Sequence, residues 1–189
     1  MAINLTHNSR LYCNNSLLSQ ALKLLLLKKE IVVTIESTTD TPKTGTSLPA
    51  FTHNHFLVYG ETTLLEFISE FFPDPRTLPL DPTSRAIHRM LIQTALKDLY
   101  PLCDKDHEDL IPTLNESAQA LSNHNYFLNN QIYTIDCVLA PVIWRVMSKP
   151  GLHPAFITYT HRLRKFFDNK TEEQKVILET NHTEYTQWA

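Results

Sequence analysis

The chain has 189 residues, of which 42% are hydrophobic and 20% charged, and its formal net charge is −3 at pH 7. This balance is typical of a globular protein that can bury a core, and the length fits two small domains, since domains cluster at roughly 100–150 residues. An acidic chain whose longest basic run is Arg162-Leu-Arg-Lys165 is not expected to bind nucleic acid directly. Only 3 glycines against 11 prolines argue against a glycine-rich phosphate loop.

The cysteine pattern and the absence of long apolar runs indicate the cell compartment. Cys13, Cys103 and Cys137 show no paired spacing, which favours reduced thiols in a cytoplasm over a disulfide framework. The most apolar run, 24–27, is far shorter than the roughly 20 residues that span a bilayer. No basic region followed by an apolar stretch opens the sequence, so no secretory signal is predicted. We therefore expect a cytoplasmic protein without membrane contact.

The first part of the chain predicts a small α/β unit. Residues 10–13 indicate a short strand, and Ser16 is expected to cap a leucine-rich helix that runs to about Lys29. The β-branched residues 31–35 predict a buried strand of the parallel type. Residues 38–47 contain Thr, Asp, Pro and Gly and predict a loop.

A strand-to-helix turn follows this loop. The alternation of Phe51, Phe56 and Val58 predicts strands, and the apolar spacing then becomes helical after Gly60. The helical apolar set comprises Leu64, Leu65, Ile68, Phe71 and Phe72. A helix that opens directly after a strand leaves backbone N–H groups unpaired, and such a helix start suits a carboxylate ligand. The predicted order to this point is β-α-β-loop-β-β-α.

The second part of the chain predicts a linker followed by helices. Residues 73–82 hold four prolines and cannot form a helix or a central strand. Asp81 and Pro82 together indicate a helix start. That helix would carry Ile87, Met90, Leu91, Ala95 and Leu99. Residues 110–121 predict a weaker helix, and 154–167 an amphipathic one that precedes a polar tail.

The most regular helical pattern begins at Thr134-Ile-Asp136. Its apolar residues follow the helical period without a break: Ile135, Val138, Leu139, Val142, Ile143 and Val146. We expect this helix to be the buried centre of the helical half. Thr134 and Asp136 are predicted to form its structural cap, and losing Asp136 should cost about 1 kcal/mol or more.

Three motifs give the chain a resemblance to the glutathione S-transferase fold. Leu48-Pro49 resembles the cis-proline step before the third strand of that family. Gly60-Glu61-Thr62 resembles its acidic-hydroxyl pair at the following helix, and Thr134-Ile-Asp136 its capping element at the core helix. The resemblance implies a thioredoxin-like α/β domain at 1–73 and an all-α domain at 83–189, joined by a Pro-rich linker at 74–82.

Within that superfamily the chain resembles the stringent starvation protein A family. The matching positions are Tyr59, Phe72-Pro73, Arg85, Met90, Lys97-Asp98, Tyr100, Tyr126-Phe127, Asp136-Cys137, Leu139-Ala140-Pro141 and Trp144-Arg145. The run around Pro141 is unusual because a proline inside a helix removes a backbone hydrogen bond. The resemblance implies a stress-response regulator that keeps the transferase fold without its activity. It also implies association with bacterial RNA polymerase holoenzyme and sigma factor, as a homodimer or a heterodimer with a paralogue.

An active transferase would need a hydroxyl or thiol after the first strand to stabilise a thiolate. Tyr12, Cys13 and Ser16 are the candidates. A nearby helix N-terminus would lower the pKa of the Cys13 thiol, whereas a buried cysteine at a strand end would be inert. By resemblance, Glu61-Thr62 beside Leu48-Pro49 would bind the amino-acid end of glutathione; the alternative is a plain helix cap. A glutathione-dependent transferase or thiol-binding enzyme is thus the alternative function, and otherwise no cofactor is expected.

The linker is the predicted partner surface. The family has a Pro-His-Pro type element there, and this chain reads Pro73-Asp74-Pro75, so a fixed negative charge replaces an imidazole. The predicted partner-binding residues are Phe72, Pro73, Asp74, Pro75, Leu80, Arg85, His88 and Arg89. The alternative is a stiff connection between domains.

His53 and His55 share a strand face but lack a third ligand at a suitable spacing, so no metal site is predicted.

Overall fold

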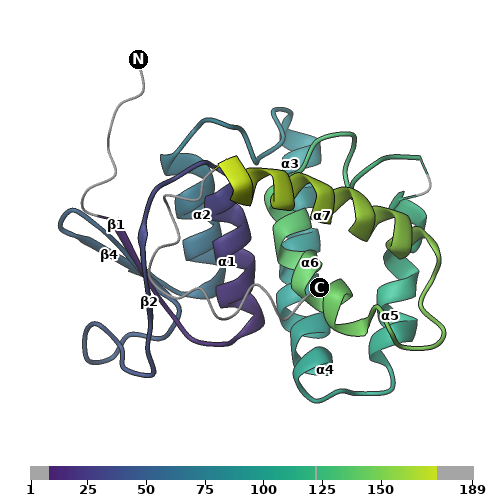
Figure 1. Ribbon diagram of the computed structural model, residues 1–189, viewed down its shortest axis with the longest axis horizontal. Helices are drawn as coiled ribbons and strands as arrows, with labels where there is room; N and C mark the ends of the chain where they lie inside the picture. Colours follow the sequence, from purple (N-terminus) through teal and green to yellow (C-terminus); the bar gives the residue numbers. More distant parts are fainter. Residues whose placement is uncertain (1–8, 122, 174–189) are drawn as a thin grey trace.

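A four-stranded mixed sheet forms the N-terminal half of the computed structural model, which describes residues 9–121 and 123–173 (Figure 1). The strands are β1 (Ser9–Cys13), β2 (Thr34–Ser37), β3 (Ala50–His53) and β4 (Phe56–Tyr59). Their order is β2-β1-β3-β4; β1 pairs parallel with β2 and antiparallel with β3, and β3 pairs antiparallel with β4. The predicted order β-α-β-loop-β-β-α is confirmed. The tail predicted beyond residue 173 lies outside the described residues.

The position of β2 differs from the sequence expectation. The β-branched stretch predicted a strand over 31–35, but β2 is a partly exposed edge strand that begins at Thr34. Ile31 and Val33 are buried, yet they belong to the connection from the preceding helix. The N–H of Ile31 donates to the carbonyl of Leu26 at 3.1 Å. Because this backbone group closes the helix end, the ladder with β1 starts later.

Two helices cover one face of the sheet. The first, α1 (Leu17–Lys28), begins after Ser16, whose hydroxyl accepts the N–H of Ser19 at 3.2 Å, so the predicted cap is confirmed. The second, α2 (Glu61–Phe71), follows β4 directly. In Figure 1 both lie between the sheet and the helical half. Buried leucines of α1 therefore belong to one core shared by the two halves.

The C-terminal half is helical, as predicted. Its elements are α3 (Pro82–Thr94), a π-helical turn (Ala95–Leu99), α4 (Tyr100–Asp104), α5 (Leu110–Glu116), a 3₁₀ turn (Ser117–Leu121), α6 (Thr134–Val146) and α7 (Ala155–Glu173). Asp81 caps α3, because its carboxylate accepts the N–H of Ser84 at 2.8 Å. Pro101 opens α4 without an N–H to donate, which accounts for the widened π-helical turn before it.

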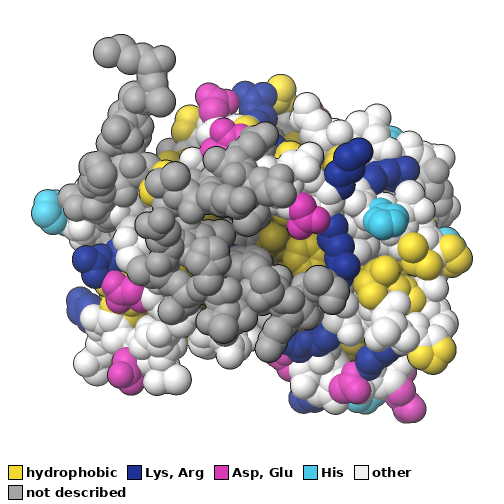
Figure 2. All heavy atoms as spheres, in the orientation of Figure 1, with side chains coloured by type: hydrophobic (Ala, Val, Ile, Leu, Met, Phe, Trp, Pro, Cys, Tyr) yellow, Lys and Arg dark blue, Asp and Glu magenta, His cyan; other side chains and the backbone are white. Residues whose placement is uncertain are grey.

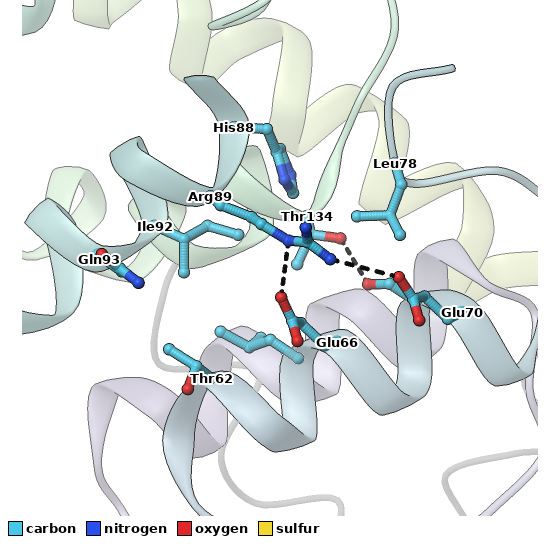
Figure 3. A pocket seen from close by; sticks show the side chains of 11 residues that line it. Thr62, Glu66, Glu70, Leu78, His88, Arg89, Ile92, Gln93 and Thr134 are labelled. Carbon is cyan, nitrogen blue, oxygen red and sulfur yellow. Dashed lines mark hydrogen bonds and ion pairs between the residues drawn. The ribbon is translucent and has the colours of Figure 1, made fainter. Parts of the chain in front are cut away.

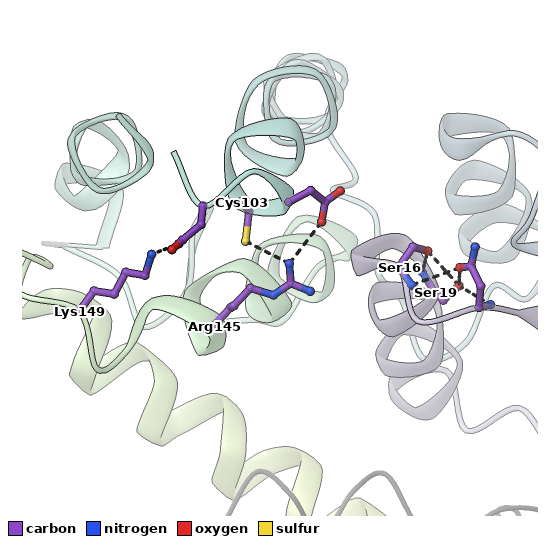
Figure 4. Close-up of polar contacts among 8 residues, drawn as sticks. Ser16, Ser19, Cys103, Arg145 and Lys149 are labelled. Atoms are coloured by element: carbon purple, nitrogen blue, oxygen red, sulfur yellow. Dashed lines mark hydrogen bonds and ion pairs between the residues drawn. The ribbon is translucent and has the colours of Figure 1, made fainter. Parts of the chain in front are cut away.

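Helix α6 is the buried centre of this half, and it packs against α1 in the most extensive helix–helix contact of the described residues. Pro141 is buried within α6 without ending it. Arg145 near its end joins it to α4, since the guanidinium donates to the Asp104 carboxylate at 3.2 Å and lies 3.8 Å from the Cys103 sulfur (Figure 4).

Helix α3 turns a polar residue inward. Ile87 and Met90 are 41% and 58% exposed, whereas His88 is 1% exposed and Ile92 is buried beside it. Of the apolar residues expected on this helix and its continuation, only those after residue 91 are buried. An exposed apolar strip is therefore left on α3.

Charged side chains of both signs lie on the two halves of the molecule. Figure 2 shows acidic and basic side chains on both halves of the face that it draws, and α7 carries Arg162, Arg164 and Lys165. None of the helices within residues 9–121 and 123–173 combines the length and hydropathy needed to cross a membrane.

Candidate functional site

The register of the sheet gathers the predicted thiol-site residues at one edge. Tyr12 lies opposite Ala50, and Ala50 lies opposite Tyr59. The next residues along the three strands are therefore Cys13, Pro49 and Gly60, which share this edge. The Leu48–Pro49 peptide bond is cis, as the resemblance implied.

Cys13 and Ser16 are poorly placed to act on a bound thiol. Cys13 is fully buried at the end of β1. The Ser16 hydroxyl donates to Ser19 Oγ at 3.1 Å, and Ser19 Oγ in turn donates to Asn14 Oδ1 at 2.9 Å (Figure 4). A hydroxyl has one hydrogen, and that of Ser16 is used within this network. Capping of α1 thus occupies the group that would stabilise a thiolate.

The start of α2 is open. Its N-cap is Gly60 at φ 92°, and no side chain among residues 9–121 and 123–173 caps the helix. This corrects the alternative in which Glu61-Thr62 forms the cap: both residues are exposed and lie inside the first turn. The left-handed φ suits glycine at this position. Within the described part of the chain, the first N–H groups of α2 therefore have no side-chain cap, as expected for a site that suits a carboxylate.

The linker is only partly a surface. Pro73 and Asp74 are exposed, Leu80 is 71% exposed, and Pro75 and Arg85 are half-buried. Two residues of the predicted partner surface are buried, and for them the prediction is wrong. They are Phe72, whose ring packs edge-on against Phe51 with centroids 6.4 Å apart, and His88.

Buried contacts fix the chain just before the linker and the middle of the linker. Before the linker, Lys29 donates to the carbonyls of Ser69 and Phe72. Farther along, the Thr77 carbonyl accepts from both the N–H and the hydroxyl of Thr134, at 2.9 and 3.1 Å. Burial lowers the pKa of Lys29 to about 8. The exposed part of the linker is therefore presented by fixed anchors.

The start of α6 is capped by Asp136 from inside the helix. Its carboxylate accepts the N–H groups of Tyr133 and Phe127 at 2.8 and 3.1 Å and the hydroxyl of Tyr159 at 3.0 Å. Burial outweighs these bonds and raises the pKa of Asp136 to about 6. Thr134 is not the N-cap, which is Tyr133; its hydroxyl instead joins α6 to the linker and to Ser69 of α2.

A cavity lies between α2 and α3 beside the linker. His88 and Arg89 of α3 face Glu66 and Glu70 of α2 across it, with Thr134 behind (Figure 3). Arg89 Nε donates to Glu66 at 2.8 Å, and its Nη2 lies 3.7 Å from Glu70. The sequence carried one signal for this site, the acidic pair Glu66 and Glu70 one helical turn apart.

No group of three His, Cys, Asp or Glu side chains within the described residues could hold a metal ion. His53 is buried and shares a hydrogen bond of 2.7 Å with Ser9 Oγ, while His55 is exposed in the β3–β4 turn.

The fold is that of glutathione transferases. Solved structures similar to the chain include transferase Omega 3C from Trametes versicolor (TM-score 0.70, 22% identity, 84% of this chain and 85% of that one) and a Bombyx mori glutathione transferase (TM-score 0.75, 14% identity, 88% and 92%). A Burkholderia transferase homologue with bound glutathione is similar as well (TM-score 0.67, 18% identity, 88% and 99%). The fold class predicted from the sequence, a thioredoxin-like α/β unit with an all-α unit, is confirmed.

Similar curated proteins are stringent starvation protein A homologues. Those of Histophilus somni and Pasteurella multocida are each 25% identical to this chain, over 113 and 152 residues. The first match covers 54% of this chain and 53% of the relative, and the second covers 73% and 71%. The chain thus spans about half the length of the first relative. No family model matches the chain. The resemblance stated from the sequence is confirmed at this level.

Proposed function

We propose that this protein is a stringent starvation protein A-like regulator that associates with bacterial RNA polymerase holoenzyme in the cytoplasm. The observation that carries the proposal is the anchored linker. Lys29 fixes the chain just before it and Thr134 fixes Thr77 within it, while Pro73, Asp74 and Leu80 are exposed. A surface that is already ordered loses less conformational entropy on binding, so a small area can be specific. The similarity to stringent starvation protein A homologues supplies the kind of partner.

We propose further that the protein is not a transferase and needs no cofactor. The supporting observations are the buried Cys13 and the use of the Ser16 hydroxyl in the cap of α1. Asp74 gives the linker a fixed negative charge where the family element has an imidazole. We expect its contact on the polymerase or sigma factor to be a basic side chain.

A binding measurement tests the polymerase proposal. Purified holoenzyme is passed over the immobilised full chain, and Leu80→Asp is compared with Ile157→Asp. Both residues are exposed apolar side chains, at 71% and 51%, but Ile157 lies on α7, away from the linker. We expect wild type and Ile157→Asp to retain polymerase and Leu80→Asp to bind at least about tenfold more weakly. No retention by wild type, or equal retention by the two variants, overturns the proposal.

A glutathione-dependent enzyme is the second candidate. It is favoured by the sheet edge that gathers Cys13, Pro49 and Gly60 and by the open start of α2. Calorimetry with glutathione distinguishes the two functions. Micromolar affinity together with thiol turnover would establish the enzyme and remove the non-enzymatic part of the proposal.

The exposed strip on α3 supports a dimer. Ile87 and Met90 lie one turn apart on α3 and are 41% and 58% exposed. Exposed apolar side chains that neighbour each other are typical of a protein interface. We propose that a second copy, or a paralogue, packs here.

A further inference from the structure

One side of α7 is exposed to solvent and carries basic side chains. Ile157, His161 and Lys165 follow one another at intervals of four residues, and all three are exposed. Residues four apart are neighbours on a helix surface, so these side chains form one row. Arg162 and Arg164 flank the row on its two sides, the first exposed and the second half-buried. We call these five residues the α7 face.

The cations of the α7 face are not neutralised by other described residues. Arg162 donates to the carbonyl of Asn125 at 3.4 Å, and a carbonyl does not neutralise a guanidinium. Within residues 9–121 and 123–173, no ion pair includes Arg164 or Lys165. Arg89 of α3, by contrast, has two carboxylates beside it. The α7 face therefore keeps its positive charge available.

Carboxylates are almost absent from the part of the sequence that contains α7. Residues 117–167 include one acidic residue, Asp136, although the whole chain has 20. Asp136 is 0% exposed and so contributes nothing to the surface. The exposed residues of this segment thus carry no carboxylate, and the negative charge of the chain lies elsewhere.

Charges at the edge of the α7 face reduce its positive charge only in part. Asp168 is exposed at the end of the face, which leaves three cations against one carboxylate. Helix α1 packs against α7 (Figure 1), and the ammonium of Lys28 lies 5.1 Å from the centroid of the Phe166 ring. Lys29 and Glu30 follow Lys28, so this end of α1 adds no net negative charge. The α7 face is therefore a positive area on a chain whose formal net charge is −3.

We propose that the α7 face binds an acidic peptide segment of a partner protein. Carboxylates of the segment lie over Arg162, Arg164 and Lys165, and an apolar side chain lies over Ile157. Between the apolar and the basic end of the row, the His161 imidazole can donate a hydrogen bond. Opposite charges placed in this way guide association and select the partner.

A peptide fits this face better than a nucleic acid does. Duplex DNA carries one negative charge per about 1.7 Å, so it would extend beyond three cations onto a chain with 20 acidic and 17 basic residues. Ile157 is 51% exposed in the same row and offers an apolar contact that phosphates do not use. A short acidic peptide contacts the α7 face alone. Because this face lies away from the linker, its binding and that of polymerase succeed or fail separately.

Fluorescence anisotropy with three labelled probes tests the proposal on the full chain. One peptide has a leucine followed by six glutamates, the second has glutamines in place of the glutamates, and the third probe is a single-stranded DNA of equal charge. We expect the glutamate peptide to bind at low salt with a dissociation constant on the order of 0.1–1 mM. The glutamine peptide should bind about tenfold more weakly. Salt at about 1 M should weaken the glutamate peptide, because it screens exposed charges.

Two lysine variants locate the binding site. Lys165→Gln removes a cation from the α7 face, and Lys105→Gln removes one that is exposed between Asp104 and Asp106. Both variants change the net charge equally. We expect Lys165→Gln to weaken the glutamate peptide about twofold to fivefold and Lys105→Gln to leave its affinity unchanged.

Ile157→Asp adds a carboxylate and removes the apolar contact, so it should weaken the glutamate peptide more than Lys165→Gln does, while still retaining polymerase. Leu80→Asp should bind the peptide as wild type does. Equal effects of the two lysine variants, or unchanged peptide binding by Ile157→Asp, would overturn the site. Equal affinity for the glutamate and glutamine peptides would overturn the role of charge. Tighter binding of the DNA than of the glutamate peptide would overturn the assignment to a protein partner.

Discussion

Lys29 places a positive charge in the interior, where α1, the end of α2 and the linker meet. It is 2% exposed, and its ammonium donates to the carbonyl of Ser69 at 2.9 Å and to that of Phe72. Burial lowers its pKa from 10.5 to about 8, and the charge of Asp74 opposes this only in part. We predict that loss of the Lys29 proton above pH 8 stabilises the folded protein and that Lys29→Met abolishes this pH dependence.

The direction in which folding stability changes with pH follows from the number of protons bound in the folded and unfolded states. Between pH 8 and 10.5 the unfolded chain keeps the Lys29 proton while the folded chain has released it, so raising the pH favours folding. From about pH 8 to about pH 9.5 this contributes about 2 kcal/mol, at 1.36 kcal/mol per pH unit. Cys103 and Cys137 act in the opposite direction, because burial raises their thiol pKa and the unfolded thiols ionise first. The difference between wild type and Lys29→Met isolates the lysine.

Urea unfolding followed by circular dichroism measures this difference at several pH values from neutral upward. We expect the stability of wild type minus that of Lys29→Met to grow by about 2 kcal/mol between pH 8 and pH 9.5. Lys165→Met, at an exposed position of α7, is the control and should show no such change. A difference that stays constant or shrinks over this range would refute the reasoning.

Three further changes have expected outcomes. Asp136→Ala leaves two buried N–H groups and a tyrosine hydroxyl without their acceptor, and we expect a loss of more than about 1 kcal/mol in urea unfolding at pH 7. Met90→Lys places a charge on the exposed strip of α3 and should turn the proposed dimer into a monomer in light scattering; Ile157→Lys on α7 should not. Ser69→Ala removes the hydroxyl bond from α2 to Thr134 and should lower the melting temperature by a few degrees, equivalent to about 1 kcal/mol.

The parts of the fold that follow from local chemistry could be predicted from the sequence. Ser16 and Asp81 mark helix starts because a side-chain oxygen there accepts a backbone N–H, a bond made within three residues. Helix α6 was predictable because its apolar residues follow the helical period from Ile135 to Val146, and these residues are buried. The linker was predictable because its prolines exclude regular structure.

The parts that depend on distant contacts were not predictable in the same way. An apolar pattern shows that residues are buried, not which element contains them, so Ile31 and Val33 were assigned to a strand that begins after them. The rotation of α3 depends on its neighbours. His88 is inside because the N–H of Ile135, 47 residues away in sequence, reaches its Nε2. No spacing in the local sequence records that bond.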